Sequence, residues 1–252
     1  MTRTRTRWVL SRPGGDPQGA HVYCFPHSGG SPGEYLRWAT RLPAHRVRAV
    51  QPPGRGSRLD EEPYTDMAPL VDALVSQVAF EEPYTLFGHS LGALVAYETA
   101  LALRERGLPG PRALVLSGTA APHALPVRPS LRHLDGPELA AAVERTYGPL
   151  PAGLHEDPEL RDLLLTSLRA DLEIVSGYRH RPVPPLSCPL TVLGGSDDSE
   201  PLDGLGAWRT YTTGPFDLQI LPGDHFYFRE CPDVFFALLD RVLDRPLDRP
   251  LA

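Results

Sequence analysis

The sequence predicts an α/β protein with a mostly parallel sheet and helices on both faces. Short apolar, β-prone runs alternate with helical patterns along most of the chain, as in sheets whose parallel strands are joined by helices. A chain of 252 residues is also long enough to bury a large core as one domain. We expect strands at residues 21–25, 47–50, 84–87, 113–117, 190–193 and 218–221, and helices at residues 33–41, 67–79, 93–106, 205–212 and 233–242.

The alternation breaks at about residues 121–185, where no strand is predicted and proline is frequent. Two helices are expected there, at residues 138–147 and 159–178. In the second helix, apolar residues recur at steps of three and four, which makes one apolar stripe. We expect this insertion to form a lid, with an ordinary packing subdomain as the alternative. The stripe consists of Leu160, Leu163, Leu164, Leu168, Leu172 and Val175.

The most specific motif is Gly88-His89-Ser90-Leu91-Gly92, which has the G-x-S-x-G form of a nucleophile elbow. The predicted strand at residues 84–87 leads into it. The predicted helix at 93–106 leaves it, is rich in Ala, Leu and Glu, and ends at Gly107. The two glycines let strand and helix approach closely while the serine hydroxyl stands clear of a strained turn. Ser90 is therefore the expected nucleophile.

A serine hydroxyl is a poor nucleophile, so Ser90 needs a base, and the base needs an acidic partner. In an α/β-hydrolase these residues follow in the order serine, acid, histidine along the chain. His225 fits that order because it follows the last predicted strand and precedes the final helix. His180 ends a helix of the insertion between two arginines, and we expect it to be solvated. His225 is therefore the expected base.

The acid is expected in the loop after the predicted strand at residues 190–193. Two aspartates compete there, Asp197 and Asp198. We prefer Asp198 because an acid three residues after the loop glycine Gly195 clears the end of the strand. Asp197 would then orient the loop, and it remains open as the alternative acid.

Turnover also requires donors for a developing oxyanion. One is expected from the backbone N–H of Leu91, the residue after the nucleophile. The second is expected from the loop after the strand at residues 21–25, where the N–H of Ser28 is the best candidate. His27 is expected to shape this loop, and His89 to pack beneath the elbow.

Composition excludes several other kinds of chemistry. The chain has no lysine, which excludes Schiff-base catalysis and a P-loop, and no asparagine, which excludes a Cys-His-Asn triad. A net charge of -6 argues against a nucleic-acid partner. Three unclustered cysteines suggest neither a disulfide framework nor a metal site. The apolar runs are too short for a signal peptide or a membrane span, so we expect a cytoplasmic protein.

Several segments together resemble the stand-alone type II thioesterases that accompany polyketide and non-ribosomal peptide synthetases. The resemblance extends from about Cys24 to Phe228 and places the family's triad on Ser90, Asp198 and His225. Leu91 stands where the family often has Met, and Ser199 replaces a frequent Pro, which keeps the Asp197 alternative open. The matching segments are residues 24–30, 51–55, 86–93, and 207–215 running into 222–226.

The resemblance implies hydrolysis of acyl thioesters from the phosphopantetheine arm of acyl or peptidyl carrier proteins, through an acyl-serine intermediate. This reaction clears stalled or mis-loaded units from a synthase. The enzyme itself is expected to be a monomer that needs no cofactor or metal, since its substrate is carried on the 4'-phosphopantetheine of the partner. A general esterase or peptidase of the same fold is the alternative, and a non-catalytic binding module is a third possibility.

A carrier partner also predicts a local basic surface. Carrier domains are generally acidic and this chain is itself acidic, so global charge cannot attract them. The insertion carries arginines that we expect to supply such a surface, namely Arg128, Arg132, Arg169, Arg179 and Arg181.

Overall fold

One seven-stranded sheet organises the protein. The computed structural model describes residues 7–13, 15–127, 130–131, 133–147 and 158–244. The strand order is β1-β3-β2-β4-β5-β6-β7, and every neighbouring pair is parallel except β1 with β3. The predicted fold class is therefore confirmed. The strands are β1 (Val9–Leu10), β2 (His21–Phe25), β3 (Arg46–Val50), β4 (Tyr84–His89), β5 (Ala113–Ser117), β6 (Leu190–Gly195) and β7 (Phe216–Leu221).

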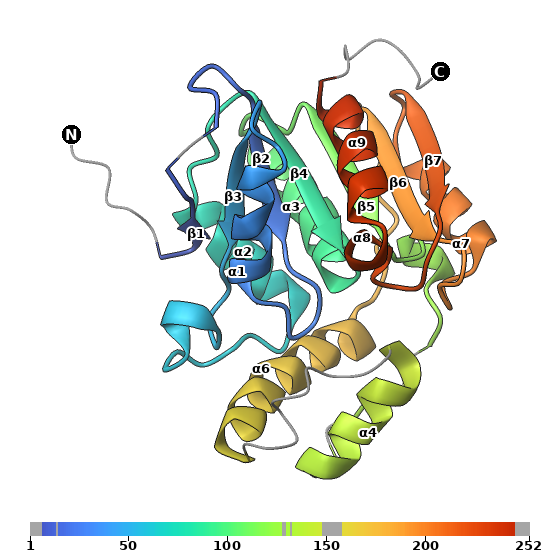
Figure 1. Cartoon of the computed structure of the whole chain (residues 1–252). Coiled ribbons are helices and arrows are strands. Elements are labelled where there is room, and N and C mark those ends of the chain that lie inside the picture. The colour runs from blue at the N-terminus through green and yellow to red at the C-terminus, as the bar shows by residue number, and fades with distance from the viewer. Residues whose placement is uncertain (1–6, 14, 128–129, 132, 148–157, 245–252) are drawn as a thin grey trace.

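Helices cover both faces of this sheet (Figure 1). α1 (Pro32–Arg37) and α9 (Pro232–Leu243) pack on one face, whereas α2 (Met67–Gln77) and α3 (Leu91–Glu105) pack on the other. The strands supply both cores because successive side chains point to opposite faces. The remaining helices are α4 (Gly136–Tyr147), α6 (Pro158–Gly177), α7 (Leu202–Gly206) and α8 (Tyr227–Glu230).

The alternation is clearest in β2, all of whose residues are buried. Val22 and Cys24 belong to the core beneath α1 and α9. Tyr23 and Phe25 belong to the core beneath α2 and α3. A strand that is apolar on both sides must be covered on both sides, so continuous apolar runs predict a sheet with helices on both faces.

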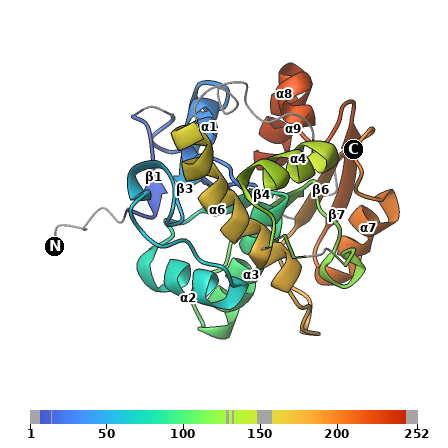
Figure 2. The same cartoon turned by 90° about the horizontal axis from the view of Figure 1, so that it is seen from below.

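The insertion places α4 and α6 across the carboxyl ends of the strands (Figures 1 and 2). The two helices share a small core of their own to which Leu165, Leu168 and Leu172 of α6 contribute. The predicted helical character of residues 121–185 is thus confirmed for α4 and α6. The side chains of Leu160 and Leu163 lie outside the described residues.

The structure differs from the prediction mainly in short elements. β1 and α8 were not predicted because two-residue strands and single helical turns carry no periodicity. The helices expected at residues 33–41 and 205–212 are present, but each is an α-helix followed by a 3₁₀ turn, at Trp38–Thr40 after α1 and at Ala207–Tyr211 after α7. Across the described residues, none of the helices combines the length and apolar character that crossing a bilayer requires.

Candidate active site

Ser90 stands on a strained turn between β4 and α3. Its φ of 54° makes it the one non-glycine residue with positive φ in the described part of the chain, and its N–H donates to the Ser117 carbonyl at 2.8 Å. A Cβ added at Gly88 would lie 2.1 Å from the Gly92 carbonyl oxygen, and one at Gly92 would lie 2.2 Å from that of Phe25. Both glycines are therefore sterically required, as the motif predicts.

His225 and Asp198 meet in the loops that follow β7 and β6. The Nδ1 of His225 lies 2.9 Å from Oδ2 of Asp198, and the Asp198 side chain is fully buried. The other oxygen of Asp198 accepts the Glu200 N–H at 3.1 Å. Asp197 is exposed and its carboxylate instead accepts from Ser196 Oγ at 3.2 Å. The structure thus brings Asp198, and not Asp197, to the predicted histidine.

The two predicted amide donors come from the start of α3 and from the loop after β2. Leu91 begins α3, so its N–H is one of the helix N-terminal donors that have no intrahelical partner. Ser28 follows β2 and lines the same cavity as Ser90 and His225. In the described part of the chain neither amide has an acceptor, so both are available to a substrate oxygen.

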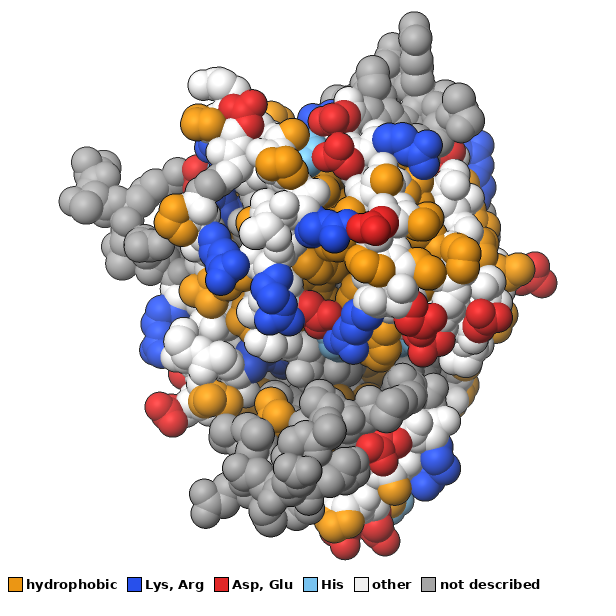
Figure 3. All heavy atoms as spheres, viewed as in Figure 1, with side chains coloured by type: hydrophobic (Ala, Val, Ile, Leu, Met, Phe, Trp, Pro, Cys, Tyr) orange, Lys and Arg blue, Asp and Glu red, His pale blue; other side chains and the backbone are white. Residues whose placement is uncertain are grey.

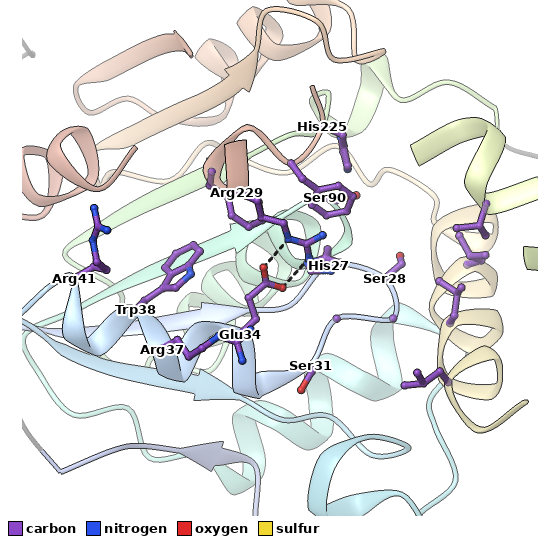
Figure 4. A pocket seen from close by; sticks show the side chains of 18 of the residues that line it. His27, Ser28, Ser31, Glu34, Arg37, Trp38, Arg41, Ser90, His225 and Arg229 are labelled. Atoms are coloured by element: carbon purple, nitrogen blue, oxygen red, sulfur yellow. Dashed lines mark hydrogen bonds and ion pairs between the residues drawn. The ribbon is translucent and has the colours of Figure 1, made fainter. Parts of the chain in front are cut away.

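A cavity of about 760 Å³ contains Ser90, Ser28 and His225 on its wall. One part of its lining comes from the insertion, whose α6 contributes leucines that point toward the site (Figure 4). The opposite part lies along α1 and α9 and includes Trp38 and Phe236. Figure 3 shows a hollow with hydrophobic side chains at its centre and charged side chains of both signs around it. The insertion leucines that line the cavity are Leu164, Leu165, Leu168 and Leu172.

An ion pair between Arg229 and Glu34 forms part of the cavity wall. The guanidinium of Arg229 donates to both carboxylate oxygens of Glu34 at 2.8 Å and lies 4.1 Å from the ring centre of Phe226 (Figure 4). Burial, the largest single influence, raises the pKa of Glu34, but the hydrogen bonds from Arg229 and the nearby positive charges together outweigh it, so the net pKa is lowered. Arg229 therefore holds a carboxylate charged at the wall of the cavity.

His27 is a neutral shaping residue, as predicted. Burial lowers its pKa to about 3. Its Nε2 lies 3.4 Å from an Arg229 nitrogen and its Nδ1 lies 3.1 Å from the Tyr35 hydroxyl. Since arginine can only donate, Nε2 accepts and the proton resides on Nδ1. His27 therefore orients the wall of the cavity without carrying charge.

His89 packs beneath the elbow, which confirms its predicted role. It is fully buried, its Nδ1 lies 2.7 Å from Ser117 Oγ, and burial holds its pKa well below the usual value. His180 departs from the prediction, because it is half-buried against the Tyr211 ring at 5.7 Å between centroids. It lies outside the lining of the cavity. Of the downstream histidines expected to compete for the base, His225 alone lines the cavity with Ser90.

Sequence reasoning missed the charged pairs around the cavity. Glu34 and Arg229 are 195 residues apart, and no local pattern links them. Asp171 carried a usable signal, since it is a charged residue next to Leu172 of the apolar stripe. In the structure it is 4% exposed.

Among the described residues, one group offers metal-ligand spacing, with ligand atoms within 4.8 Å of one another on His45, Asp240 and Asp244. His45 precedes β3, so this group lies at the amino ends of the strands, away from Ser90. It therefore takes no part in the candidate active site.

A nucleophile elbow, a histidine paired with a buried aspartate and an insertion over the carboxyl ends of a parallel sheet define a serine hydrolase of the α/β-hydrolase class. The family described as Thioesterase domain matches residues 20–244. The chain therefore belongs to the thioesterase family and is a serine-dependent thioester hydrolase of the type II kind found in polyketide and non-ribosomal peptide systems.

Similar proteins support this placement. The chain is 37% identical to thioesterase PikA5 of Streptomyces venezuelae, over 83% of this chain and 75% of that protein. The type II thioesterase BorB from the borrelidin biosynthetic cluster superposes with a TM-score of 0.83 at 33% identity, covering 94% of this chain and 97% of that one. The linear gramicidin dehydrogenase LgrE of Brevibacillus parabrevis is 33% identical over 93% of this chain and 92% of that protein. Despite that last name, this sequence contains no G-x-G-x-x-G dinucleotide fingerprint.

Proposed function

We propose that the protein removes acyl groups from the phosphopantetheine arm of acyl or peptidyl carrier proteins by hydrolysis, as an editing enzyme of a synthase. The observation that carries the proposal is that Ser90, His225 and the leucines of α6 line one cavity. An apolar chamber beside the nucleophile suits an acyl chain, while a thioester needs little protonation of its leaving group.

The proposed catalytic residues are Ser90, Asp198 and His225, with the N–H groups of Ser28 and Leu91 as oxyanion donors. Ser90 Oγ attacks the thioester carbonyl while His225 Nε2 takes its proton, and Asp198 stabilises the imidazolium through Nδ1. The two amides stabilise the oxyanion until the C–S bond breaks and the thiolate leaves with that proton. Water then attacks the acyl-serine, with His225 again as base, and the free acid departs.

The same proposal covers cofactors, cellular location, partners and domain organisation. The mechanism needs no cofactor or metal, and the net charge of -6 argues against a nucleic-acid partner. A cytoplasmic monomer without a membrane partner is part of the same proposal. Residues 1–252 are taken as one domain with 121–185 as its lid. Of the expected arginines, Arg179 and Arg181 are exposed, and Arg181 lies 3.5 Å from Glu105. Arg169 donates to the Leu131 carbonyl at 3.2 Å. The two remaining arginines, Arg128 and Arg132, lie outside the described residues.

The first test concerns the nucleophile. Ser90→Ala removes one side-chain oxygen at a partly buried turn, so kcat is expected to fall by about 10³-fold or more while the free energy of unfolding stays unchanged. Retention of a tenth of the activity by pure protein refutes the assignment.

The second test concerns the substrate. One acyl group is offered on a carrier protein, on a short pantetheine thioester and on an oxoester, and kcat/KM is compared. We expect the carrier to be preferred by about tenfold or more, which equals about 1.4 kcal/mol of differential transition-state binding. Equal values for carrier and mimic would remove carrier recognition from the mechanism. A preference for the oxoester would favour a general esterase.

A further inference from the structure

Two charged side chains hold the loop that follows β2. The carboxylate of Asp171, on α6, accepts the N–H of Gly29 at 2.8 Å through Oδ2 and an Nη2–H of Arg55 at 2.7 Å through Oδ1. Arg55 in turn donates to the Gly30 carbonyl at 3.3 Å. We call these two side chains the Arg55–Asp171 clamp. It joins the lid helix, the segment after β3 and the loop that carries Ser28.

The clamp is buried, with side-chain exposures of 7% for Arg55 and 5% for Asp171. The Nε of Arg55 has no hydrogen-bond partner in the described part of the chain, and Asp171 is the carboxylate that compensates the guanidinium charge. Removing one partner of a buried ion pair leaves an uncompensated charge and is strongly destabilising. α6 therefore cannot move away from the loop without exposing Arg55 and the Gly29 N–H to water together.

His27, at the start of the loop, is held by Tyr35 and Arg229, but the turn that follows has one backbone hydrogen bond of its own. Gly29 has a φ of +70°, and the N–H of Gly30 closes a turn on the His27 carbonyl at 2.8 Å. The clamp binds this turn through two hydrogen bonds, one from the Gly29 N–H and one to the Gly30 carbonyl. Leu168 of α6 packs against the same turn, since a Cβ at Gly29 would lie 3.2 Å from Leu168 Cδ1. The orientation of the adjacent Ser28 amide thus depends on α6.

We propose that Arg55 and Asp171 are positioning residues that couple the seating of the lid helix α6 to the assembly of the oxyanion site. When α6 is seated, the clamp fixes the turn and aims the Ser28 N–H at the substrate carbonyl. When α6 lifts, the turn loses its contacts with Asp171 and Leu168, Arg55 loses its charged partner, and this donor is no longer held in place. The proposal rests on the proposed function for the role of Ser28, but the linkage between helix and loop does not.

The kinetic test uses two variants that disturb the clamp differently. Asp171→Asn keeps an oxygen for Gly29 but removes the charge that Arg55 needs. The double variant Arg55→Met with Asp171→Leu replaces the ion pair by apolar side chains, which often preserves or raises stability. In both we expect kcat to fall by about 10- to 100-fold, approaching the effect of losing one oxyanion donor, while KM changes by less than about threefold.

Glu173→Gln is the matched control. Glu173 is also a buried carboxylate on α6, but it accepts from Ser130 Oγ at 2.8 Å, and its kinetics are expected to be those of the unaltered chain. Affinity for an acyl trifluoromethyl ketone, whose adduct with Ser90 carries an oxyanion, should fall with kcat in the clamp variants alone. A double variant that unfolds like the unaltered chain and keeps its kcat would overturn the proposal.

Hydrogen exchange tests the linkage without relying on activity. Amides in residues 26–31 and in α6 are expected to exchange faster together in Asp171→Asn, and to be unchanged in Glu173→Gln. Loosening of α6 with unchanged exchange in the loop would show that the two are independent and refute the coupling. If the unaltered chain hydrolyses no thioester, the proposed function fails, while this measurement still decides the coupling.

Discussion

The sharpest test of the site compares two neighbouring aspartates. In the structure Oδ1 of Asp198 accepts the Glu200 N–H while Oδ2 faces Nδ1 of His225. In Asp198→Asn the amide oxygen therefore stays with Glu200 and the NH₂ group faces the imidazole. Nδ1 must then accept, so the ring proton moves to Nε2. A histidine in that tautomer cannot take the proton of Ser90.

The size of the effect follows from the geometry of the pair. With the Nδ1–Oδ2 contact at 2.9 Å, the charge centres of carboxylate and imidazolium lie about 4 Å apart. At an effective dielectric constant of about 20 their attraction is about 4 kcal/mol, which corresponds to about 10³-fold in rate. Both side chains are at least nine-tenths buried, so screening by salt reduces this little.

The assay follows thiol release from an acyl-pantetheine thioester with purified variants. Asp197→Asn is the control, because Asp197 is exposed and contacts Ser196, and its kcat is expected to stay within about threefold of the unaltered chain. A slower Asp197→Asn than Asp198→Asn would assign the acid to Asp197 and refute the reasoning.

Three further predictions concern the chamber, the pH response and the elbow. Leu164→Phe fills part of the cavity and should move the acyl-length optimum toward shorter chains; an unchanged profile with altered stability alone would indicate a packing role. Burial lowers the pKa of His27 to about 3, so below pH 6.5 the unfolded chain binds a proton that the folded chain does not. The free energy of unfolding therefore decreases as the pH falls. From pH 7 to 5 the unaltered chain should lose about 2 kcal/mol more than His27→Gln in urea titrations. Equal losses would contradict the buried neutral state. Gly92→Ala should destabilise by about 3 kcal/mol or more, whereas Gly206→Ala, with no atom within 4 Å of the new Cβ, should change little; similar unfolding midpoints would rule out the steric requirement.

The elements that could be predicted are those whose pattern is local. β2, β4 and β5 are buried along nearly their whole length, so apolar runs identify them directly. The elbow is likewise a local arrangement of strand, turn and helix, and it places Ser90 without tertiary information.

The choice between the two aspartates depends on register, which the sequence leaves open. Pairing with β7 continues past β6, as the N–H of Ser196 donates to the Leu221 carbonyl and that of Asp197 to the Gly223 carbonyl. This extension leaves the Asp197 side chain exposed and lets that of Asp198 reach His225. The pairing partner lies about 25 residues away, so local pattern alone cannot reveal it.

The ion pairs Glu34–Arg229 and Arg55–Asp171 could not be predicted either, because the partners are far apart in the sequence. Periodicity identifies which face of α6 is apolar, but it does not identify a partner for Asp171 that lies 116 residues earlier in the chain. Arg55 falls in one of the segments that carry the family resemblance, yet only the folded chain shows that it contacts the lid helix.

The close approach of Gly92 to the Phe25 carbonyl has a consequence for how this site tolerates sequence change. The segments that lead to Leu91 and Ser28 touch through main-chain atoms of Gly92, Phe25 and Pro26, so a missing side chain sets how closely they approach. At residues 28 and 91 any replacement except proline therefore keeps the N–H in a mutational library. The positions intolerant of any replacement will be Gly88 and Gly92, neither of which lines the cavity.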